Sequence, residues 1–264
     1  MGVAACRRPM EKHMSLASTT LTAILLAATA FVPAAVAQDA QKTVVLVHGA
    51  WANGASWSKV IPILEKAGLK VVAVHNPLSS LAADVANTKR VIDDQAGGVI
   101  LVGHSYGGAV ITEAGNNEKV ESLVYVAAFA PEAGQSINAI IQPFGTPEYF
   151  PSIHADAGHY STWPADAMQK WFAPDVPADE VAVMAATQGP FFLGIFDEVV
   201  TTAAYKTKPT WFVVATQDQI IPPPLQTHFA ELTKATVMPV EASHVPMVSQ
   251  PEAVANAILS AAGL

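Results

Sequence analysis

The chain has 264 residues, of which 51% are hydrophobic and 14% charged, so it can bury a large core as one domain and is neither disordered nor fibrous. Its formal net charge is −8, and Arg90 is the only arginine beyond residue 37. We therefore expect that neither nucleic acid nor an anionic membrane surface is a partner.

The first 37 residues have the pattern of a secretory signal peptide. Basic residues precede a short apolar run over 21–32, and the stretch ends in Ala35-Val-Ala37, a small-residue cleavage site. Pro33 and the shortness of the run argue against a membrane span. We expect cleavage after Ala37, export to the periplasm or the medium of a bacterium, and no stable membrane association afterwards. Cys6, the only cysteine, would leave with the leader.

Strands and helices are predicted to alternate over the first half of the remaining chain. Short apolar runs predict buried strands over 43–48, 71–75, 99–103 and 122–127, and apolar residues at helical spacing predict helices near 57–64, 80–92 and 109–114. This alternation predicts a mostly parallel sheet with helices on both faces.

The alternation stops between about 131 and 208, a stretch rich in proline and aromatic residues. Helices are predicted near 134–141, 164–172 and 178–186, and no strand pattern is present. We interpret this stretch as a helical cap inserted over the carboxyl edge of the sheet. Most of its aromatic side chains are expected to pack the cap onto the core, and a few to line an apolar pocket.

The alternation then returns to the end of the chain. A strand over 210–216, a helix over 224–234, a last strand over 236–240 and a closing helix over 251–262 are predicted. Residues 38–264 are thus expected to form one domain that contains the cap insertion.

The motif Gly103-His-Ser105-Tyr-Gly107 lies between a predicted buried strand and a predicted helix. A G-x-S-x-G sequence in that position is typical of a nucleophile elbow, a strained turn that exposes the serine Oγ. Small residues on both sides let strand and helix pass closely. We predict Ser105 as a nucleophile; the alternative is a tight turn with a capping serine.

A serine nucleophile needs a base, and the base needs an orienting acid. On an elbow the expected chain order is serine, acid, histidine. Asp218 follows one predicted strand end and His244 follows the last strand, so they are the predicted acid and base. Asp218 as a simple turn carboxylate is the alternative, and Asp197 and Glu198 are weaker acid candidates.

Six further histidines remain beyond the leader. We expect a structural role for His75 and hydrogen bonds that shape the two catalytic loops for His48 and His104. His154 and His159, in the cap, are minor candidates for substrate contact, and His228 is expected at an exposed helix position.

The oxyanion of a tetrahedral intermediate needs two preorganised donors. The backbone N–H groups of Tyr106 and Ala50 are predicted to supply them, with Gly49 allowing close approach. The Trp51 and Tyr106 side chains would form the mouth of the site. The expected substrate pocket comprises Gly49, Trp51, Phe129, Trp163, Phe191 and Val245. No metal and no organic cofactor are expected.

Four motifs in this order resemble the α/β-hydrolase superfamily. They are Val47-His-Gly-Ala50 with Ala55-Ser-Trp57, Gly103-His-Ser-Tyr-Gly-Gly108, Asp218-x-x-Ile-Pro222, and Ser243-His244 with Ser249-x-Pro251. The resemblance is closest to the branch of plant methylesterases, hydroxynitrile lyases and bacterial carboxylesterases such as pyrethroid hydrolases. It implies an α/β-hydrolase fold, a Ser105-Asp218-His244 triad and an oxyanion hole from Ala50 and Tyr106.

Two positions distinguish activities within that branch. Hydroxynitrile lyases of this type carry threonine and lysine where this chain has Gly49 and Val245, so lyase activity is disfavoured. We expect a serine esterase acting on a small, largely apolar carboxylic ester through an acyl-enzyme. The alternatives are a lactonase, a cofactor-free perhydrolase or haloperoxidase, and a ligand-binding module with little turnover. The sequence leaves open whether the protein is a monomer or a homodimer.

Overall fold

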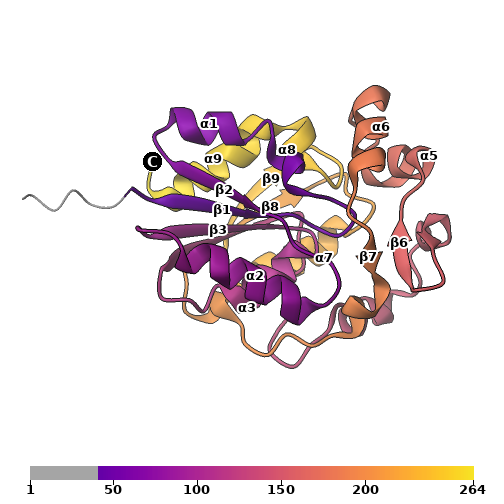
Figure 1. Ribbon diagram of the computed structural model, residues 1–264, viewed down its shortest axis with the longest axis horizontal. Helices are drawn as coiled ribbons and strands as arrows, with labels where there is room; N and C mark the ends of the chain where they lie inside the picture. The colour runs from indigo at the N-terminus through magenta and orange to yellow at the C-terminus, as the bar shows by residue number, and fades with distance from the viewer. Residues whose placement is uncertain (1–40) are drawn as a thin grey trace, which may run out of the picture. The chain divides into compact units, whose positions relative to one another are not determined.

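The structure, a computed structural model, describes residues 41–264 (Figure 1). The predicted signal peptide and its cleavage site lie outside the described residues. Within residues 41–264, no helix combines the length and apolarity needed to cross a bilayer.

The core is a six-stranded sheet in the order β2-β1-β3-β4-β8-β9, in which every pair of neighbours is parallel. All residues of the inner strands β1 and β3 are buried, as expected when helices cover both faces. Edge strand β9 carries Pro239, which cannot donate to a sheet and is tolerated at an edge. The strands are β1 (Thr43–Val47), β2 (Lys70–Val74), β3 (Val99–His104), β4 (Val120–Val126), β8 (Thr210–Ala215) and β9 (Thr236–Val240).

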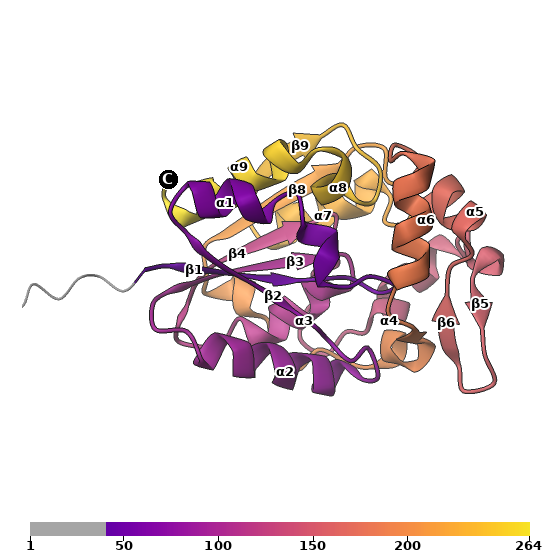
Figure 2. The same ribbon diagram turned by 45° about the horizontal axis from the view of Figure 1, so that its top comes forward.

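Helices cover both faces of this sheet. Figures 1 and 2 show α1 (Ile61–Lys66) and α9 (Pro251–Ala262) on one face and α2 (Leu81–Asp93) and α3 (Gly107–Ala114) on the other. Helix α7 (Pro223–Leu232) packs against β8. A 3-10 turn over Gly54–Trp57 and the short helix α8 (Pro246–Ser249) complete this part of the chain. The predicted fold class, a mostly parallel sheet between two helical layers, is confirmed.

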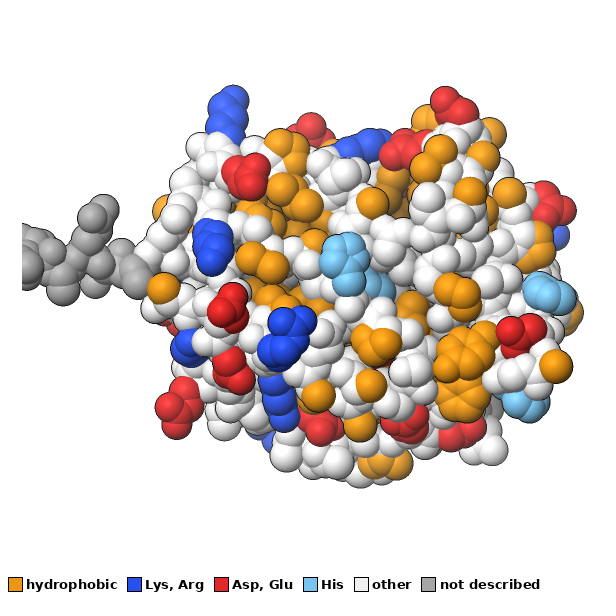
Figure 3. Space-filling model, in the orientation of Figure 1, with side chains coloured by type: hydrophobic (Ala, Val, Ile, Leu, Met, Phe, Trp, Pro, Cys, Tyr) orange, Lys and Arg blue, Asp and Glu red, His pale blue; other side chains and the backbone are white. Residues whose placement is uncertain are grey.

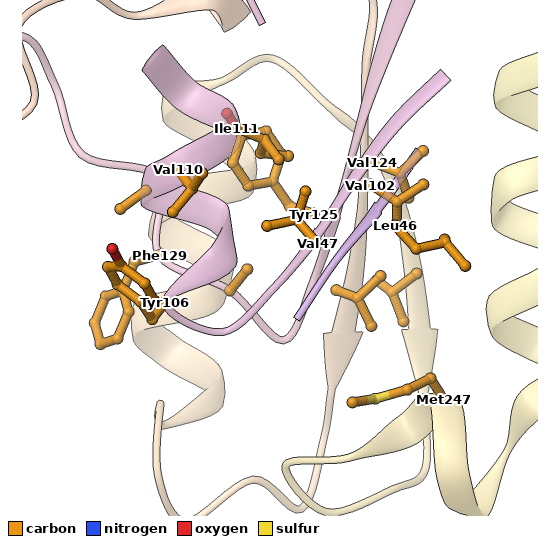
Figure 4. Packing of buried hydrophobic residues seen from close by; sticks show 14 of the residues in the cluster. Leu46, Val47, Val102, Tyr106, Val110, Ile111, Val124, Tyr125, Phe129 and Met247 are labelled. Carbon is orange, nitrogen blue, oxygen red and sulfur yellow. The ribbon is translucent and has the colours of Figure 1, made fainter. Parts of the chain in front are cut away.

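Alternating strand residues fill the two halves of the core. In Figure 4, Val47 and Tyr125 point toward α3, whereas Leu46, Val102 and Val124 point to the opposite face. All five side chains are fully buried. Because these strands are parallel, the carboxyl ends of β1, β3, β4 and β8 lie at one edge of the sheet, where polar loops can meet.

The segment between β4 and β8, residues 127–209, contributes no strand to the main sheet, and we call it the cap segment. Its part from β5 to α6 lies beyond the carboxyl ends of the main strands (Figures 1 and 2). Its helices are α4 (Ile137–Ile141), α5 (Ala165–Ala167), a π-helical turn (Met168–Phe172) and α6 (Ala178–Thr187), with 3-10 turns at Gln142–Phe144, Phe150–Ser152, Leu193–Asp197 and Ala204–Lys206. Helices thus occur near all three ranges where they were predicted.

The expectation that this segment holds no strand was wrong. It contains a three-stranded antiparallel sheet of β5 (His154–Ala155), β6 (Tyr160–Thr162) and β7 (Phe191–Phe192). Strands this short cannot show a recognisable alternation of apolar and polar residues. Their pairing also joins Ser161 to Phe191, far apart in the chain, so no local pattern encodes it.

Candidate active site

Ser105 lies in the turn between β3 and α3, and its φ of 53° is in the left-handed region. A Cβ on Gly103 would lie 2.6 Å from the Gly107 carbonyl oxygen, and a Cβ on Gly107 would lie 2.7 Å from the His48 carbonyl oxygen. Side chains at these two positions would therefore collide with backbone. The strained serine and its small neighbours are the features of a nucleophile elbow.

The structure brings together the three side chains predicted as a triad. Ser105 Oγ lies 2.8 Å from His244 Nε2, and His244 Nδ1 lies 2.7 Å from Asp218 Oδ2. All three residues are buried. The weaker acid candidates, Asp197 and Glu198, make no hydrogen bond to His244. Asp197 accepts a hydrogen bond from Asn138, and Glu198 accepts one from the Leu81 N–H.

Three further donors, besides the imidazole of His244, hold the Asp218 carboxylate. Oδ1 accepts from the backbone N–H groups of Ile220 at 2.7 Å and Ile221 at 3.1 Å. Oδ2 accepts from Gln226 Nε2 at 2.8 Å, in addition to the imidazole. Both carboxylate oxygens thus accept from N–H donors, and the proton between Asp218 and His244 lies on His244 Nδ1.

Gln226 is a site residue that the sequence analysis missed. Its Oε1 accepts from the Ala215 N–H at 3.0 Å, and its Nε2 also donates to the Ile221 carbonyl at 2.6 Å. These bonds fix which end of the amide faces Asp218. The only signal for Gln226 in the sequence was that a polar residue stands on the buried face of α7.

Two buried histidines hold the catalytic loops, as expected. His104 Nε2 donates to the His244 carbonyl at 2.7 Å, and His48 Nε2 accepts from the Asn76 N–H at 3.1 Å. Burial lowers the pKa of His48 to about 4 and that of His104 well below its usual value, so both rings are neutral. The other four histidines outside the triad and the leader, His75, His154, His159 and His228, are exposed.

The two residues predicted to supply the oxyanion donors lie at the same cavity as the serine. Ala50 and Tyr106 line the same small cavity as Ser105. Within residues 41–264, neither backbone N–H donates a hydrogen bond to protein. Two unpaired donors beside the serine are what a developing oxyanion requires.

The Tyr106 side chain does not form the mouth of the site, which corrects the expectation. Its ring borders the small cavity, but its hydroxyl donates to Asp84 Oδ2 at 2.7 Å. Asp84, on α2, also accepts from the Leu78 N–H at 3.0 Å. Burial raises the pKa of Asp84 to about 6 and the pKa of Tyr106 well above its usual value. A buried hydroxyl–carboxyl pair thus anchors the residue that follows the nucleophile.

Trp51 connects the loop of Ala50 to the cap segment. Its φ of 54° is strained for a residue with a side chain. Its indole N–H donates to Ser161 Oγ at 2.9 Å, and that hydroxyl donates to the Phe191 carbonyl at 2.9 Å. The ring packs within 6.0 Å of the rings of Trp163, Phe191 and Phe196. The cap therefore surrounds the residue next to one oxyanion donor.

The cap segment also contacts the loop that carries His244. The Asp175 carboxylate accepts hydrogen bonds from the backbone N–H and the hydroxyl of Ser243. The Phe172 ring lies 4.8 Å from the imidazole of His244 in an edge-on arrangement. Neither residue was singled out from the sequence, since both contacts join positions about 70 residues apart.

The cavity at Ser105, which we call the catalytic chamber, has a volume of about 20 Å³. Of the predicted pocket residues it includes only Trp51 and Phe129. The chamber is lined by Ala50, Trp51, Ser105, Tyr106, Phe129, Ile137, Ile141, Tyr149, Phe150, Phe196 and Ile220.

Four predicted pocket residues lie outside the chamber. Trp163 and Phe191 pack against the Trp51 ring, with centroids 5.7 and 5.5 Å away, and only Trp51 of the three lines the chamber. Gly49 lies against the Ser105 Cβ, where an added Cβ would come within 2.8 Å of it. Val245 lines a separate cavity of about 160 Å³ next to α6 and α8. The missed lining residues are mostly aliphatic or aromatic positions of the cap.

The surface around the cap segment is poor in cations. Figure 3 shows that most Lys and Arg side chains on that face lie away from β6 and β7. Large apolar side chains are exposed on the cap segment: Phe144, Phe150, Tyr160, Val183 and Val199. In the part of the chain that the structure describes, no three His, Cys, Asp or Glu side chains cluster to hold a metal ion.

Comparisons with known proteins agree with this architecture. The chain is 38% identical over 118 residues to a carbendazim hydrolyzing esterase of Nocardioides sp., a match that covers 39% of this chain and 49% of that protein. It is 26% identical to methylesterase 1 of Arabidopsis thaliana, over 83% of this chain and 95% of that protein. It is 28% identical to a pyrethroid hydrolase of Sphingobium wenxiniae, over 81% of this chain and 85% of that protein.

Solved structures share the fold. A pyrethroid hydrolase crystal structure superposes with a TM-score of 0.72 at 22% identity, over 84% of this chain and 98% of that one. The crystal structure of polyneuridine aldehyde esterase superposes with a TM-score of 0.72 at 22% identity, over 83% of this chain and 98% of that one. The model of the alpha/beta hydrolase family matches residues 44–257, which include the elbow, Asp218 and His244. The chain therefore belongs to the α/β-hydrolase family.

Proposed function

We propose that this protein is a serine-dependent carboxylic ester hydrolase that acts through an acyl-enzyme. The observation that carries the proposal is the continuous chain from Ser105 Oγ through His244 to Asp218, beside the unpaired N–H groups of Ala50 and Tyr106. Relatives named methylesterase, pyrethroid hydrolase and carbendazim hydrolyzing esterase support ester hydrolysis.

In the first half-reaction, His244 Nε2 takes the proton of Ser105 Oγ as the oxygen attacks the ester carbonyl. Asp218 holds the other proton on Nδ1, so the Nε2 lone pair faces the serine. The tetrahedral oxyanion accepts hydrogen bonds from Ala50 and Tyr106. His244 then gives its Nε2 proton to the departing alkoxide, which leaves as the alcohol.

In the second half-reaction, water replaces the alcohol. His244 Nε2 removes a proton from the water as it attacks the acyl carbonyl, and the same oxyanion contacts hold the new intermediate. The intermediate collapses, Ser105 Oγ recovers the proton from His244, and the carboxylic acid leaves. The protein groups supply every proton transfer, so the proposed cycle uses no cofactor.

The site of action is part of the proposal. The predicted leader favours export to the periplasm or the medium, followed by action on a small, largely apolar ester. Tracking the processed chain by N-terminal sequencing in the native bacterium tests this, because retention of residues 1–37 in the cytoplasm would contradict it.

The central test is serine reactivity with turnover. A fluorophosphonate probe should label Ser105, and 4-nitrophenyl acetate should be hydrolysed. Ser105→Ala should abolish labelling and lower kcat on the order of 10⁶-fold. Stabilisation by esters without turnover would favour a ligand-binding module instead.

The competing reactions use the same machinery and need a parallel assay. Aryl esters, lactones and peroxide-dependent halogenation should be compared at equal enzyme concentration. A higher kcat/KM for lactones would identify a lactonase, and halogenation above the ester rate would identify a perhydrolase or haloperoxidase. Gly49 and Val245 predict no cyanohydrin cleavage.

A further inference from the structure

The catalytic chamber is too small for any ester. It has a volume of about 20 Å³, whereas one water molecule already needs about 10–15 Å³. A bound substrate must therefore extend beyond the chamber, past at least one of the side chains that line it.

A second cavity lies directly behind one of those walls. It has a volume of about 420 Å³ and shares four lining residues with the catalytic chamber, namely Phe129, Ile141, Tyr149 and Ile220. We call it the outer cavity. This volume lies in the range of about 300–1,000 Å³ that is usual for small-molecule sites.

The lining of the outer cavity is apolar. Beyond the shared residues it is formed mainly by Phe144, Trp171, Pro222, Pro224 and Leu225, and its polar side chains are those of Gln219 and Glu148. Another opening beside Ile141 and Phe150, which we call the polar cleft, has a volume of about 560 Å³. Its lining includes more polar side chains than that of the outer cavity, so an apolar group gains more by entering the outer cavity; these side chains are Ser136, Asn138, Gln142, Thr146 and Asp197.

The partition between chamber and outer cavity has one side chain suited to move. Phe129 and Ile220 lie a few residues after the ends of β4 and β8, whereas Ile141 and Tyr149 lie further along the cap segment. The Tyr149 hydroxyl makes no hydrogen bond with the protein in residues 41–264, and its ring is held by packing on Trp163 at 5.7 Å. Displacing Tyr149 breaks no polar contact and joins the two spaces.

We propose that the substrate is an ester with one short arm and one extended apolar arm, and that the extended arm binds in the outer cavity behind Tyr149. This inference rests on the proposed ester hydrolysis. The short arm stays in the catalytic chamber beside Ala50 and Ser105. Tyr149 and Leu225 are then specificity-determining residues, since the first separates the two spaces and the second lines the far wall.

Chain-length series on the intact protein test the proposal. One series varies the acyl arm in 4-nitrophenyl esters from acetate to decanoate, and the other varies the alcohol arm in alkyl acetates. In each series the long-to-short ratio is kcat/KM for the longest ester divided by kcat/KM for the shortest. Leu225→Trp should fill the outer cavity and lower this ratio at least about tenfold in one series. The responding series identifies the arm.

A matched control lies on the same helix. Leu232, also on α7, packs against the core and lines neither cavity. Leu232→Trp introduces the same side chain and should leave both chain-length ratios unchanged. Thermal unfolding of both variants separates a filled cavity from a damaged fold.

Removing the partition gives the opposite expectation. Tyr149→Ala should raise the long-to-short ratio at least about threefold in the series that Leu225→Trp lowers, because the wall no longer has to be displaced. If neither substitution changes either ratio, the outer cavity is not the arm's site, while Ser105-dependent acetate hydrolysis still supports the esterase. If wild type hydrolyses no ester, the proposed function itself fails.

A structure of the adduct gives a direct readout. When Ser105 Oγ displaces fluoride from a long-chain alkyl fluorophosphonate, the alkyl chain becomes fixed to the serine. We expect it to pass Tyr149 and lie against Leu225. A chain found in the polar cleft near Asn138 and Asp197 would overturn the proposal.

Discussion

The loops at the carboxyl edge of the main sheet and the cap segment build the site in different ways. The sheet loops supply Ser105, Asp218, His244 and both oxyanion donors, and backbone geometry fixes them. The cap supplies walls and side-chain tethers, such as Ser161 to Trp51. Its surface also exposes large apolar side chains, whereas the inner strands β1, β3, β4 and β8 are largely buried.

This difference separates reactivity from selectivity. The proposed chemistry depends on main-chain positions set by a parallel sheet, which tolerate little change. The cap acts on the same site through single side chains. Substitutions in the sheet loops should therefore reduce turnover of every ester, and most substitutions in the cap should alter the rate by smaller amounts or discriminate among esters.

The largest effect is expected from Asp218→Asn in the sheet loops. The backbone N–H groups of Ile220 and Ile221 cannot turn away, so they hold the asparagine oxygen at the Oδ1 position and leave its NH₂ at the Oδ2 position. An amide NH₂ facing His244 would then force the proton onto Nε2, the wrong nitrogen for a base. We expect kcat to fall about 10⁴-fold with the fold intact.

Burst kinetics and circular dichroism check that outcome. Acylation should become rate-limiting, so the burst of 4-nitrophenol disappears while the far-ultraviolet spectrum is unchanged. Activity within tenfold of wild type would show that Asp218 does not set the tautomer.

The next effect concerns stability and the buried pair of Asp84 and Tyr106. The pKa of Asp84 is raised from 3.8 to about 6, so between these values the folded state binds more protons than the unfolded state. The contribution of Asp84 to the free energy of unfolding therefore falls as pH rises from 3.8 to about 6, and it stays constant above that window. Its total is about 3 kcal/mol.

Asp84→Asn isolates this contribution. The variant cannot titrate at this position, and its amide can still accept from Leu78 and donate to Tyr106. Urea unfolding of both proteins from pH 4 to pH 8 should show a difference in unfolding free energy that grows in favour of Asn through the window. His48, whose pKa of about 4 makes both proteins lose stability in acid, cancels in the difference. If the unfolding free energies of the two proteins differ by the same amount at every pH, the pKa of Asp84 is not raised by folding.

A smaller effect is expected where the cap reaches the oxyanion loop. Ser161→Ala leaves the buried Trp51 indole N–H without a partner, at a cost of about 1–3 kcal/mol. If the tether also holds Ala50 in place, kcat should fall about tenfold with KM nearly unchanged.

A double-mutant cycle with Trp51→Phe sharpens the test. Once the indole N–H is absent, Ser161→Ala should have little further effect on kcat. Thr187→Ala is the control within the cap segment, because its exposed hydroxyl donates only to the Val183 carbonyl in its own helix. Additive losses in the cycle would mean that the two side chains act independently.

The smallest effect is expected at an exposed contact between the two regions. Lys59 Nζ lies 2.8 Å from Glu180 Oε2, and both side chains are partly exposed, at 43% and 32%. Glu180→Gln should change the unfolding free energy by no more than about 0.5 kcal/mol, and less at high salt. Urea unfolding at two salt concentrations measures this, and a loss of several kcal/mol would show that this pair fixes the cap.

The sequence by itself determined the main sheet, the elbow and the order of the proposed triad. Buried strands and an elbow are local patterns, and parallel strands bring their carboxyl ends to one edge wherever the intervening chain runs. Ser105, Asp218 and His244 could therefore be predicted although they lie 139 and 26 residues apart along the chain.

Only the tertiary structure decided what surrounds those residues. The short cap sheet, the bond from Trp51 to Ser161 across 110 residues, and the support of Asp218 by Gln226 depend on side chains meeting after the segments have packed. Four of the six predicted pocket residues lie outside the chamber for the same reason. Which aromatic side chain faces the serine and which lies behind it is set by how large rings fill a shared space, and no periodicity in the sequence records that arrangement.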